Sequence, residues 1–443
     1  MDSAQLHDVV ADALKAGADA AEAVFSERRS LDVGVREGRL EEVEREEAAD
    51  LSLRVFVEGR PAVVSGSDRS AAAVTRMIER AVAMARLAPA DPYAGLADEA
   101  LLSRAPPTDL DLLDSAEPAA EALQDQALAA EAAARAVEGV AKSDGASAGW
   151  SQGAWRLVTS AGFDGAHAAS RYSLSASAIA GEGAAMERGG EGRSVRRLQD
   201  MPSPEEIGTE GGRRAAARVG PRKLSSTTAP VIFENRVAAS LLGPLVGAIA
   251  GPSIARGTSF LKDKLGQPVF APAVTVMDDP HRPRGLGSTP FDDEGVRNGP
   301  RALVQDGVLT TWLLNTAAAR QLGLTSTGHA SRGGAGAPGV STTNLYMEPG
   351  EADLAELMRQ AGAGLLVASM FGPSLNGNTG DWSTGVQGFW FEGGEIAYPV
   401  SEITVAGNLL DLWARCVPGS DLEFRGGTNA PSLLFDAVAI AGK

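Results

Sequence analysis

The stretch Pro230-Val-Ile-Phe-Glu-Asn-Arg-Val-Ala-Ala-Ser-Leu-Leu-Gly-Pro-Leu-Val-Gly-Ala-Ile-Ala-Gly251 decides how the second half of this chain folds. It opens with Val231 to Phe233, a run of β-branched and aromatic residues that favours a strand. Small apolar residues follow, and from Val237 to Ala255 there is no His, Asp, Glu or Cys. The segment is near the length of a membrane span, but its glycines, prolines and many alanines argue against one. We expect a buried or interface helix that ends near Gly251.

The length and composition indicate a globular protein of two domains. The chain has 443 residues, of which 44% are hydrophobic and 22% charged, and this is enough for more than one core. The formal net charge is −17, so the surface repels duplex DNA and anionic lipid. Nucleic-acid binding and membrane insertion are therefore not expected. The single cysteine, Cys416, and an N-terminus without a basic and apolar leader favour the cytoplasm.

Hydrophobic periodicity predicts an α+β fold, with a mixed α/β N-terminal domain at residues 1–220 and a β-rich C-terminal domain at 221–443. Gly220-Pro221 provides the boundary between them. In the first domain, Ser3 is a plausible N-cap, and the acidic run Arg39–Glu47 is either an acidic helix or an exposed strand with Leu40 and Val43 inward. The helices expected there span 3–16, 70–87, 119–139 and 205–219, and the first strands span 20–27, 30–35 and 51–57.

Candidate metal ligands are sparse. The four histidines are His7, His167, His281 and His329, and no pair has the i, i+4 spacing that places two imidazoles on one helical face. One acidic group, residues 278–281 with residues 292–294, offers hard oxygen ligands for Mg²⁺ or Ca²⁺. The alternative is that these are turns with solvated carboxylates. A Ser-x-x-Lys pattern at Ser259 and Lys262 offers a nucleophile, although short patterns of this kind are common by chance.

The chain resembles the TldD/PmbA family, which is linked to metallopeptidase activity. The resemblance rests on the segment 230–251, on Arg282-Pro-Arg-Gly-Leu-Gly-Ser-Thr-Pro-Phe-Asp-Asp-Glu-Gly295, and on Asn378-Thr-Gly-Asp-Trp-Ser-Thr-Gly-Val-Gln-Gly388 with Gly407-Asn408. In that family the catalytic partner carries a His-Glu-x-x-x-His zinc motif on the helix that corresponds to 237–251, and a cysteine near its C-terminus. Neither is present here, since Thr428 to Leu434 contains no cysteine. The chain therefore looks like the PmbA (TldE) branch, which lacks the zinc helix. The resemblance also implies that the region around 39–47 forms a sheet, so a strand is expected there.

This resemblance implies a function and a partner. We expect a non-zinc subunit that binds no cofactor itself and is inactive alone. It would pair with a TldD-like subunit that carries the zinc, and the pair would process unfolded peptides. Thr379, Gly380, Asp381 and Ser383 are the candidates for peptide contact, because a tight glycine turn allows close backbone approach to an extended peptide. Equally, these residues could serve only to build a tight β-structure.

Two rival functions stay open from the sequence. One is a self-contained metal-dependent hydrolase that uses the carboxylates between Asp278 and Glu294. The other is a non-catalytic homodimer that binds a peptide or small ligand. Three measurements separate these rivals from the hypothesis of a non-zinc subunit. They are the metal content of the purified chain, the activity of the chain by itself, and the change in mass of the assembly when a zinc-bearing partner is added.

Overall fold

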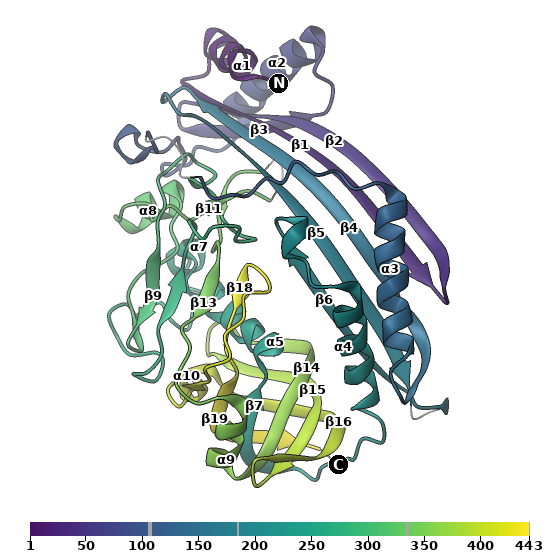
Figure 1. Ribbon diagram of the computed structural model, residues 1–443. Helices are drawn as coiled ribbons and strands as arrows, with labels where there is room; N and C mark the ends of the chain where they lie inside the picture. Colours follow the sequence, from purple (N-terminus) through teal and green to yellow (C-terminus); the bar gives the residue numbers. More distant parts are fainter. Residues whose placement is uncertain (105–108, 184–185, 334–335, 443) are drawn as a thin grey trace.

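The expected α+β class is confirmed. The computed structural model describes residues 1–104, 109–183, 186–333 and 336–442. The N-terminal half is built on one long antiparallel sheet, and the C-terminal half on two further sheets with short helical segments between them (Figure 1). Within the described ranges, we find no helix with the length and apolar character needed to cross a membrane.

The N-terminal sheet has the strand order β3-β2-β1-β4-β5-β6, with every neighbouring pair antiparallel. Its central strands are unusually long, and Figure 1 shows them curving past the C-terminal half. The sequence suggested shorter strands, but 20–27 and 30–35 are parts of the single strand β1. The acidic run 39–47 belongs to β2, as expected. The strands are β1 (Ala20–Arg36), β2 (Arg39–Val57), β3 (Arg60–Gly66), β4 (Val140–Thr159), β5 (Asp164–Ala180) and β6 (Glu187–Val195).

Four helices cover this sheet: α1 (Ser3–Lys15), α2 (Ala71–Leu87), α3 (Ala120–Arg135) and α4 (Pro204–Ala216). Helix α1 begins at Ser3 as predicted, but its N-cap is Asp2 and not Ser3, because the Asp2 side chain accepts the Gln5 amide in a capping box. Helices α3 and α4 end three to four residues before the predicted positions. All four carry apolar stripes whose residues are buried against the strands.

The side chains of β1 alternate between the two faces of the N-terminal sheet. Odd-numbered residues such as Phe25 and Val33 join the cores formed with α1 and α2 at one end and with α3 and α4 at the other. Even-numbered Val24 packs with Phe291 and Val296 from the C-terminal half. Because side chains of a strand alternate between faces, one strand contacts its own helices on one side and the second half on the other.

The C-terminal half contains a sheet that closes on itself. Its strands follow the order β16-β15-β14-β7-β19, and β16 pairs with β19 to complete the ring, while β17 extends β19. A second sheet has the order β10-β9-β8-β13-β18. The closed sheet comprises β7 (Thr227–Phe233), β14 (Ala363–Leu375), β15 (Asp381–Glu392), β16 (Glu395–Asn408) and β19 (Leu433–Ala441), with β17 (Val417–Pro418).

The remaining elements are short and lie around these sheets. The second sheet comprises β8 (Val276–Asp278), β9 (Arg301–Gln305), β10 (Val308–Leu309), β13 (Leu345–Met347) and β18 (Thr428–Asn429), and β11 (Ala330–Ser331) pairs with β12 (Gly339–Val340). Outside the segment 235–255, the helices α8 (Thr316–Leu322), α9 (Leu354–Ala361) and α10 (Leu409–Trp413) lie in this half. One core cluster includes residues from both sheets and from the segment between them.

Buried charges join the two halves. Glu22 on β1 accepts from Arg54 on β2 at 3.1 Å and from Arg332 of the C-terminal half at 2.5 Å. All three side chains are at most 5% exposed. A carboxylate that is removed from water in this way depends on its partners, and each guanidinium depends on the carboxylate.

We predict that Glu22→Ala lowers the free energy of unfolding by about 3–5 kcal/mol, because it leaves Arg54 and Arg332 buried without their carboxylate. Urea unfolding followed by circular dichroism measures this. The control is Glu356→Ala, which removes an exposed pair with Arg359 and should cost under about 1 kcal/mol. Equal losses in the two variants would contradict the structural role assigned to Glu22.

Candidate functional site

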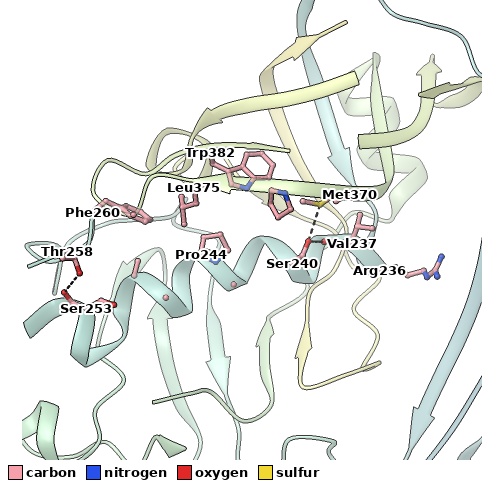
Figure 2. A pocket seen from close by; sticks show the side chains of 15 residues that line it. Arg236, Val237, Ser240, Pro244, Ser253, Thr258, Phe260, Met370, Leu375 and Trp382 are labelled. Atoms are coloured by element: carbon pink, nitrogen blue, oxygen red, sulfur yellow. Dashed lines mark hydrogen bonds between the residues drawn. The ribbon is translucent and has the colours of Figure 1, made fainter. Parts of the chain in front are cut away.

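An apolar groove with a volume of about 670 Å³ runs along the segment that follows β7. We call it the groove. Figure 2 shows the segment forming one wall, with side chains from β14, β15 and the loop at Phe260 opposite it. The residues that line the groove are Arg236, Val237, Ser240, Gly243, Pro244, Gly247, Ala248, Ser253, Thr258, Phe260, Met370, Pro373, Leu375, Gly377 and Trp382.

The first wall is helical but broken, so the expected single helix over 237–251 is wrong. The chain forms α5 (Asn235–Ala238), a 3₁₀ turn (Ala239–Leu242), α6 (Gly243–Ile249) and α7 (Gly251–Ala255). Pro244 lies in the first turn of α6, where its missing N–H leaves no helical hydrogen bond unmade. Between α6 and α7, Ala250 is extended, and Gly251 donates instead to the Leu313 carbonyl at 2.8 Å.

This wall has two faces with different side chains. Leu241, Leu242, Leu245 and Ile249 point into the core between the two C-terminal sheets and are at most 4% exposed. Ser240, Gly243 and Gly247, spaced three and four residues apart, are exposed on the other face and line the groove. A Cβ added to Gly243 or Gly247 would meet no atom within 4 Å. The groove is therefore open because small residues occupy this face.

The opposite wall comes from β14 and β15. Met370, Pro373 and Leu375 of β14 line the groove together with Trp382 of β15, and Ser240 donates to the Met370 sulfur at 3.4 Å. Strand β14 pairs with β7 only through 365–367, because β7 ends at Phe233. Beyond that point it pairs with β15 alone, so among the described residues one backbone edge of β14 has no neighbouring strand.

The predicted peptide-contact residues lie in and after a turn at one end of the groove. Thr379 donates to the Asp381 carboxylate at 2.7 Å, and the Asn408 side chain donates to the same carboxylate at 3.1 Å. These bonds lower the pKa of Asp381 below its usual range. A Cβ on Gly380, which has a φ of +81°, would approach the Phe260 ring to 3.2 Å. The turn thus packs closely against a residue that lines the groove.

Strand β15, which carries Asp381 and Ser383, is paired on both of its edges. Ser383 pairs with Ser374 of β14 on one side and with Ala406 of β16 on the other. An extended peptide therefore has no free strand edge to pair with at Ser383. The open edge belongs to β14. Contact with a peptide through Thr379, Gly380, Asp381 and Ser383 stays a prediction.

The acidic group between Asp278 and Glu294 is buried, so the expectation of solvated turn carboxylates is wrong. Asp278 accepts from the Thr343 amide at 2.7 Å, and His329 lies 3.3 Å from it. Asp292 accepts three backbone amides, and Glu294 accepts both the amide and the hydroxyl of Thr316. Burial and the neighbouring Glu294 raise the pKa of Asp292 well above its usual range.

These carboxylates order loops around them. Across the described parts of the chain, no three His, Cys, Asp or Glu side chains are grouped so as to hold a metal ion. In addition, the groove wall from Val237 to Ala255 supplies no ligand of these types. The residues present therefore do not fit a zinc site in the groove.

The Ser259–Lys262 pattern does not form a nucleophile with its base. Ser259 is 3% exposed, donates to the Ala248 carbonyl at 2.6 Å, and accepts the Leu261 amide at 3.0 Å. Its hydroxyl thus ties the loop to the groove wall. Cys416 is 1% exposed in the core, and burial raises the pKa of its thiol far above the usual range.

A network of charges lies where the groove wall begins. Arg236 is among the residues that line the groove. Figure 2 shows its guanidinium pointing away from the groove. It lies 3.5 Å from Glu191 of β6 and 3.7 Å from Glu234. Glu191 is 6% exposed and also lies within 4 Å of Arg214 and Arg425. Burial and the nearby Arg214 lower the pKa of Arg236.

Sequence reasoning singled out the segment that forms one wall of the groove, as a buried or interface helix, but it did not predict the groove. The small residues Ser240, Gly243 and Gly247 repeat with helical spacing, which was a usable signal for an exposed small-residue face. Met370 and Trp382 carried no such signal, because they reach the groove only through the pairing of β14 with β15.

Comparisons with known proteins match this fold along almost its whole length. Models of three PmbA/TldA metallopeptidase domains match the chain: domain 1 at residues 21–85, the central domain at 113–219 and the C-terminal domain at 226–442. The protein "Metalloprotease PmbA" of Escherichia coli O157:H7 is 40% identical over 427 residues, which cover 96% of this chain and 93% of that protein. A homologue of it in Haemophilus influenzae is 37% identical, with 97% and 94% covered.

A solved structure shows the same architecture. The crystal structure of a protein labelled a modulator of DNA gyrase, from Bacteroides thetaiotaomicron, superposes with a TM-score of 0.91 at 27% identity. The match covers 99% of this chain and 98% of that one. Together with the identity to the enterobacterial protein, these matches show that the chain belongs to the PmbA/TldD family of metallopeptidases.

Proposed function

We propose that this chain is the subunit without zinc in a heteromeric PmbA/TldD-type metalloprotease that processes unfolded peptides. Its partner would be a TldD-like chain that carries the zinc, and this chain alone would not cleave peptides. The observation that carries the proposal is the groove wall, whose residues from Val237 to Ala255 line an apolar groove and include no His, Asp, Glu or Cys. No step of the chemistry is assigned to residues of this chain.

The spacing on the groove wall supports this assignment. A His-Glu-x-x-x-His motif places its three functional residues at i, i+1 and i+5. Gly243, Pro244 and Ala248 have this spacing, and all three line the groove. None can donate an electron pair from its side chain to a metal. If the zinc motif of a partner chain occupies these positions, the corresponding positions here offer apolar contact area in place of ligands.

The groove has the properties that an extended, unfolded peptide needs. Its walls offer apolar side chains such as Met370, Leu375 and Trp382 to the side chains of a peptide. The open edge of β14 offers backbone groups that could pair with the peptide main chain. Bulges at 367–369 and 371–374 interrupt this edge and limit any added strand to a short length.

The rival functions receive less support. A self-contained metal hydrolase would need the carboxylates of Asp278, Asp292 and Glu294 to be available, and all three are engaged by amides or hydroxyls. A homodimeric peptide-binding protein would use the same groove, so it shares the binding step with our proposal. It differs because it predicts no gain of activity when a zinc-bearing partner is added.

We predict zinc-dependent cleavage of an unfolded peptide by an equimolar mixture of this chain and a TldD-like subunit, and none by this chain alone. A fluorogenic unfolded peptide reports cleavage, and size-exclusion chromatography with light scattering reports the mass of the assembly. The partner alone and the mixture with chelator are the controls. Cleavage by this chain alone that resists chelation would refute the proposal and return attention to Ser259 and Lys262, which need no metal ion.

We also predict that Gly247→Phe lowers kcat/KM of the mixture by at least about tenfold, because the ring would enter the open groove without meeting protein atoms. The matched control is Gly299→Phe, which also adds a ring where no atom lies within 4 Å of the new Cβ but is outside the groove. Both variants should keep the wild-type circular dichroism spectrum. A folded Gly247→Phe variant with unchanged kcat/KM would show that the groove does not receive the peptide.

Gly247 lowers the stability of the helix that contains it. Gly247 lies within α6 and has room for a Cβ, so Gly247→Ala should raise the free energy of unfolding by about 0.5–1 kcal/mol. Urea unfolding of the isolated chain measures this. A destabilised Gly247→Ala variant would mean that the helix needs glycine for a reason other than open space.

A further inference from the structure

A second, smaller pocket of about 200 Å³ lies where the two halves of the chain meet. The end of β6 forms one side, and the loops at 282–286 and 424–426 form the others. We call it the arginine pocket, because four arginines are among its lining residues. These residues are Ser194, Val195, Arg196, Asp200, Arg282, Pro283, Arg284, Gly285, Leu286, Asn344, Phe424, Arg425 and Gly426.

Two of the four arginines are neutralised by carboxylates. Arg284 donates to Asp111 and, at 3.1 Å, to Asp200. Arg425 donates to Glu191 at 2.9 Å and to Glu423 at 2.6 Å. Asp200 is the only acidic side chain that lines the pocket among the described residues, and Arg284 already uses both of its oxygens.

The other two arginines have no carboxylate within 4 Å in the described part of the chain. The guanidinium of Arg196 donates to three backbone carbonyls: Gly285 at 3.2 Å, Ser170 at 2.9 Å and Leu286 at 2.6 Å. Carbonyl dipoles hold the cation in place but leave its net charge uncompensated. Burial and the positive charge of Arg171 lower the pKa of Arg196 to about 10, which still leaves it charged at neutral pH.

Arg282 is held by stacking. The centre of its guanidinium lies 3.3 Å from the centroid of the Phe424 ring, and Phe424 in turn packs edge-on against Tyr346. Stacking on a ring face fixes the guanidinium plane while leaving the N–H groups around its rim available. Its side chain makes no hydrogen bond or ion pair within the described ranges, so it presents a fixed, unpaired fork of donors.

A positive pocket is unexpected on a chain whose formal net charge is −17. Two uncompensated guanidiniums on one small pocket attract an anion, and a planar fork of N–H donors matches an oxyanion best. The volume suits one such group better than a whole cofactor, since pockets for drug-sized ligands start at about 300 Å³.

We propose that the arginine pocket is a binding site for a small oxyanion, a phosphate or carboxylate group. Arg282 and Arg196 supply its charge, and Phe424 sets the plane of Arg282. The site lies outside the groove, so it stands independently of the proposed function. Because the pocket is built from β6 and from two loops of the C-terminal half, a bound anion stabilises the contact between the two halves.

The test is a titration of the full-length chain at constant ionic strength and pH, followed by calorimetry and by the thermal unfolding midpoint. One arm uses inorganic phosphate, the second uses acetate, and chloride is the reference salt. We expect at least one of the two oxyanions to bind saturably and to raise the midpoint above the chloride value. Binding by phosphate alone assigns the site to phosphate groups, and binding by acetate as well extends it to carboxylates.

The variant that tests the site is Arg282→Gln, which should weaken oxyanion binding at least about tenfold because it removes a charged donor. The matched control is Arg222→Gln, because Arg222 also stacks on a ring, that of Tyr398, but does not line the pocket. A second variant, Phe424→Leu, removes the stacking surface while keeping every charge, and should weaken binding by a smaller factor. Absence of saturable binding by either oxyanion would overturn the proposal, as would equal weakening in Arg282→Gln and Arg222→Gln.

Discussion

The fold of the C-terminal half depends on packing the segment 235–255 between two sheets. Leu241, Leu242, Leu245 and Ile249 fill the space between the closed sheet and the five-stranded sheet, so the rotation of this segment about its axis is fixed. Turning it would expose four large apolar side chains at about 1.5–3 kcal/mol each. Gly251 fixes its position along the axis, since a Cβ there would meet the Leu314 side chain at 2.7 Å. With that face fixed, the opposite face has to line the groove.

Buried charges join the two halves beside the apolar contact of Val24 with Phe291 and Val296. Glu22 with Arg54 and Arg332 forms one such contact, and Glu191 with its surrounding arginines forms another. Buried charges of this kind are stable only as complete sets, because each member is costly without the others. If the two halves slid or were only partly closed against each other, the members of one of these charge sets would be separated. The halves should therefore keep one relative orientation, and a peptide would meet a groove whose position relative to the N-terminal sheet is already fixed.

Much of the fold could be read from the sequence, where local signals are strong. The helix at 70–87 was placed within one residue because it carries a regular apolar stripe, whereas the acidic run 39–47 was assigned to a strand only through the family resemblance. The long strand β4 was harder, since its Ala, Ser and Gly residues show little alternation in hydrophobicity. The burial of Asp278, Asp292 and Glu294 could not be foreseen, because acidic residues beside glycine and proline are typical of solvated turns. Their amide donors come from positions up to 65 residues away.

The groove is locally unfavourable, and this is the physical reason to treat it as a functional surface. Gly243 and Gly247 weaken the helix that contains them, although each has room for a side chain that would stabilise it. The wall opposite leaves apolar atoms of Met370, Leu375 and Trp382 facing an open space, and one edge of β14 without a neighbouring strand. Each feature alone is tolerable in a stable protein. Their coincidence along one groove is explained if a ligand with apolar side chains and a free backbone covers all of them at once. An unfolded peptide has both properties along its whole length, whereas most backbone groups of a folded protein are already paired.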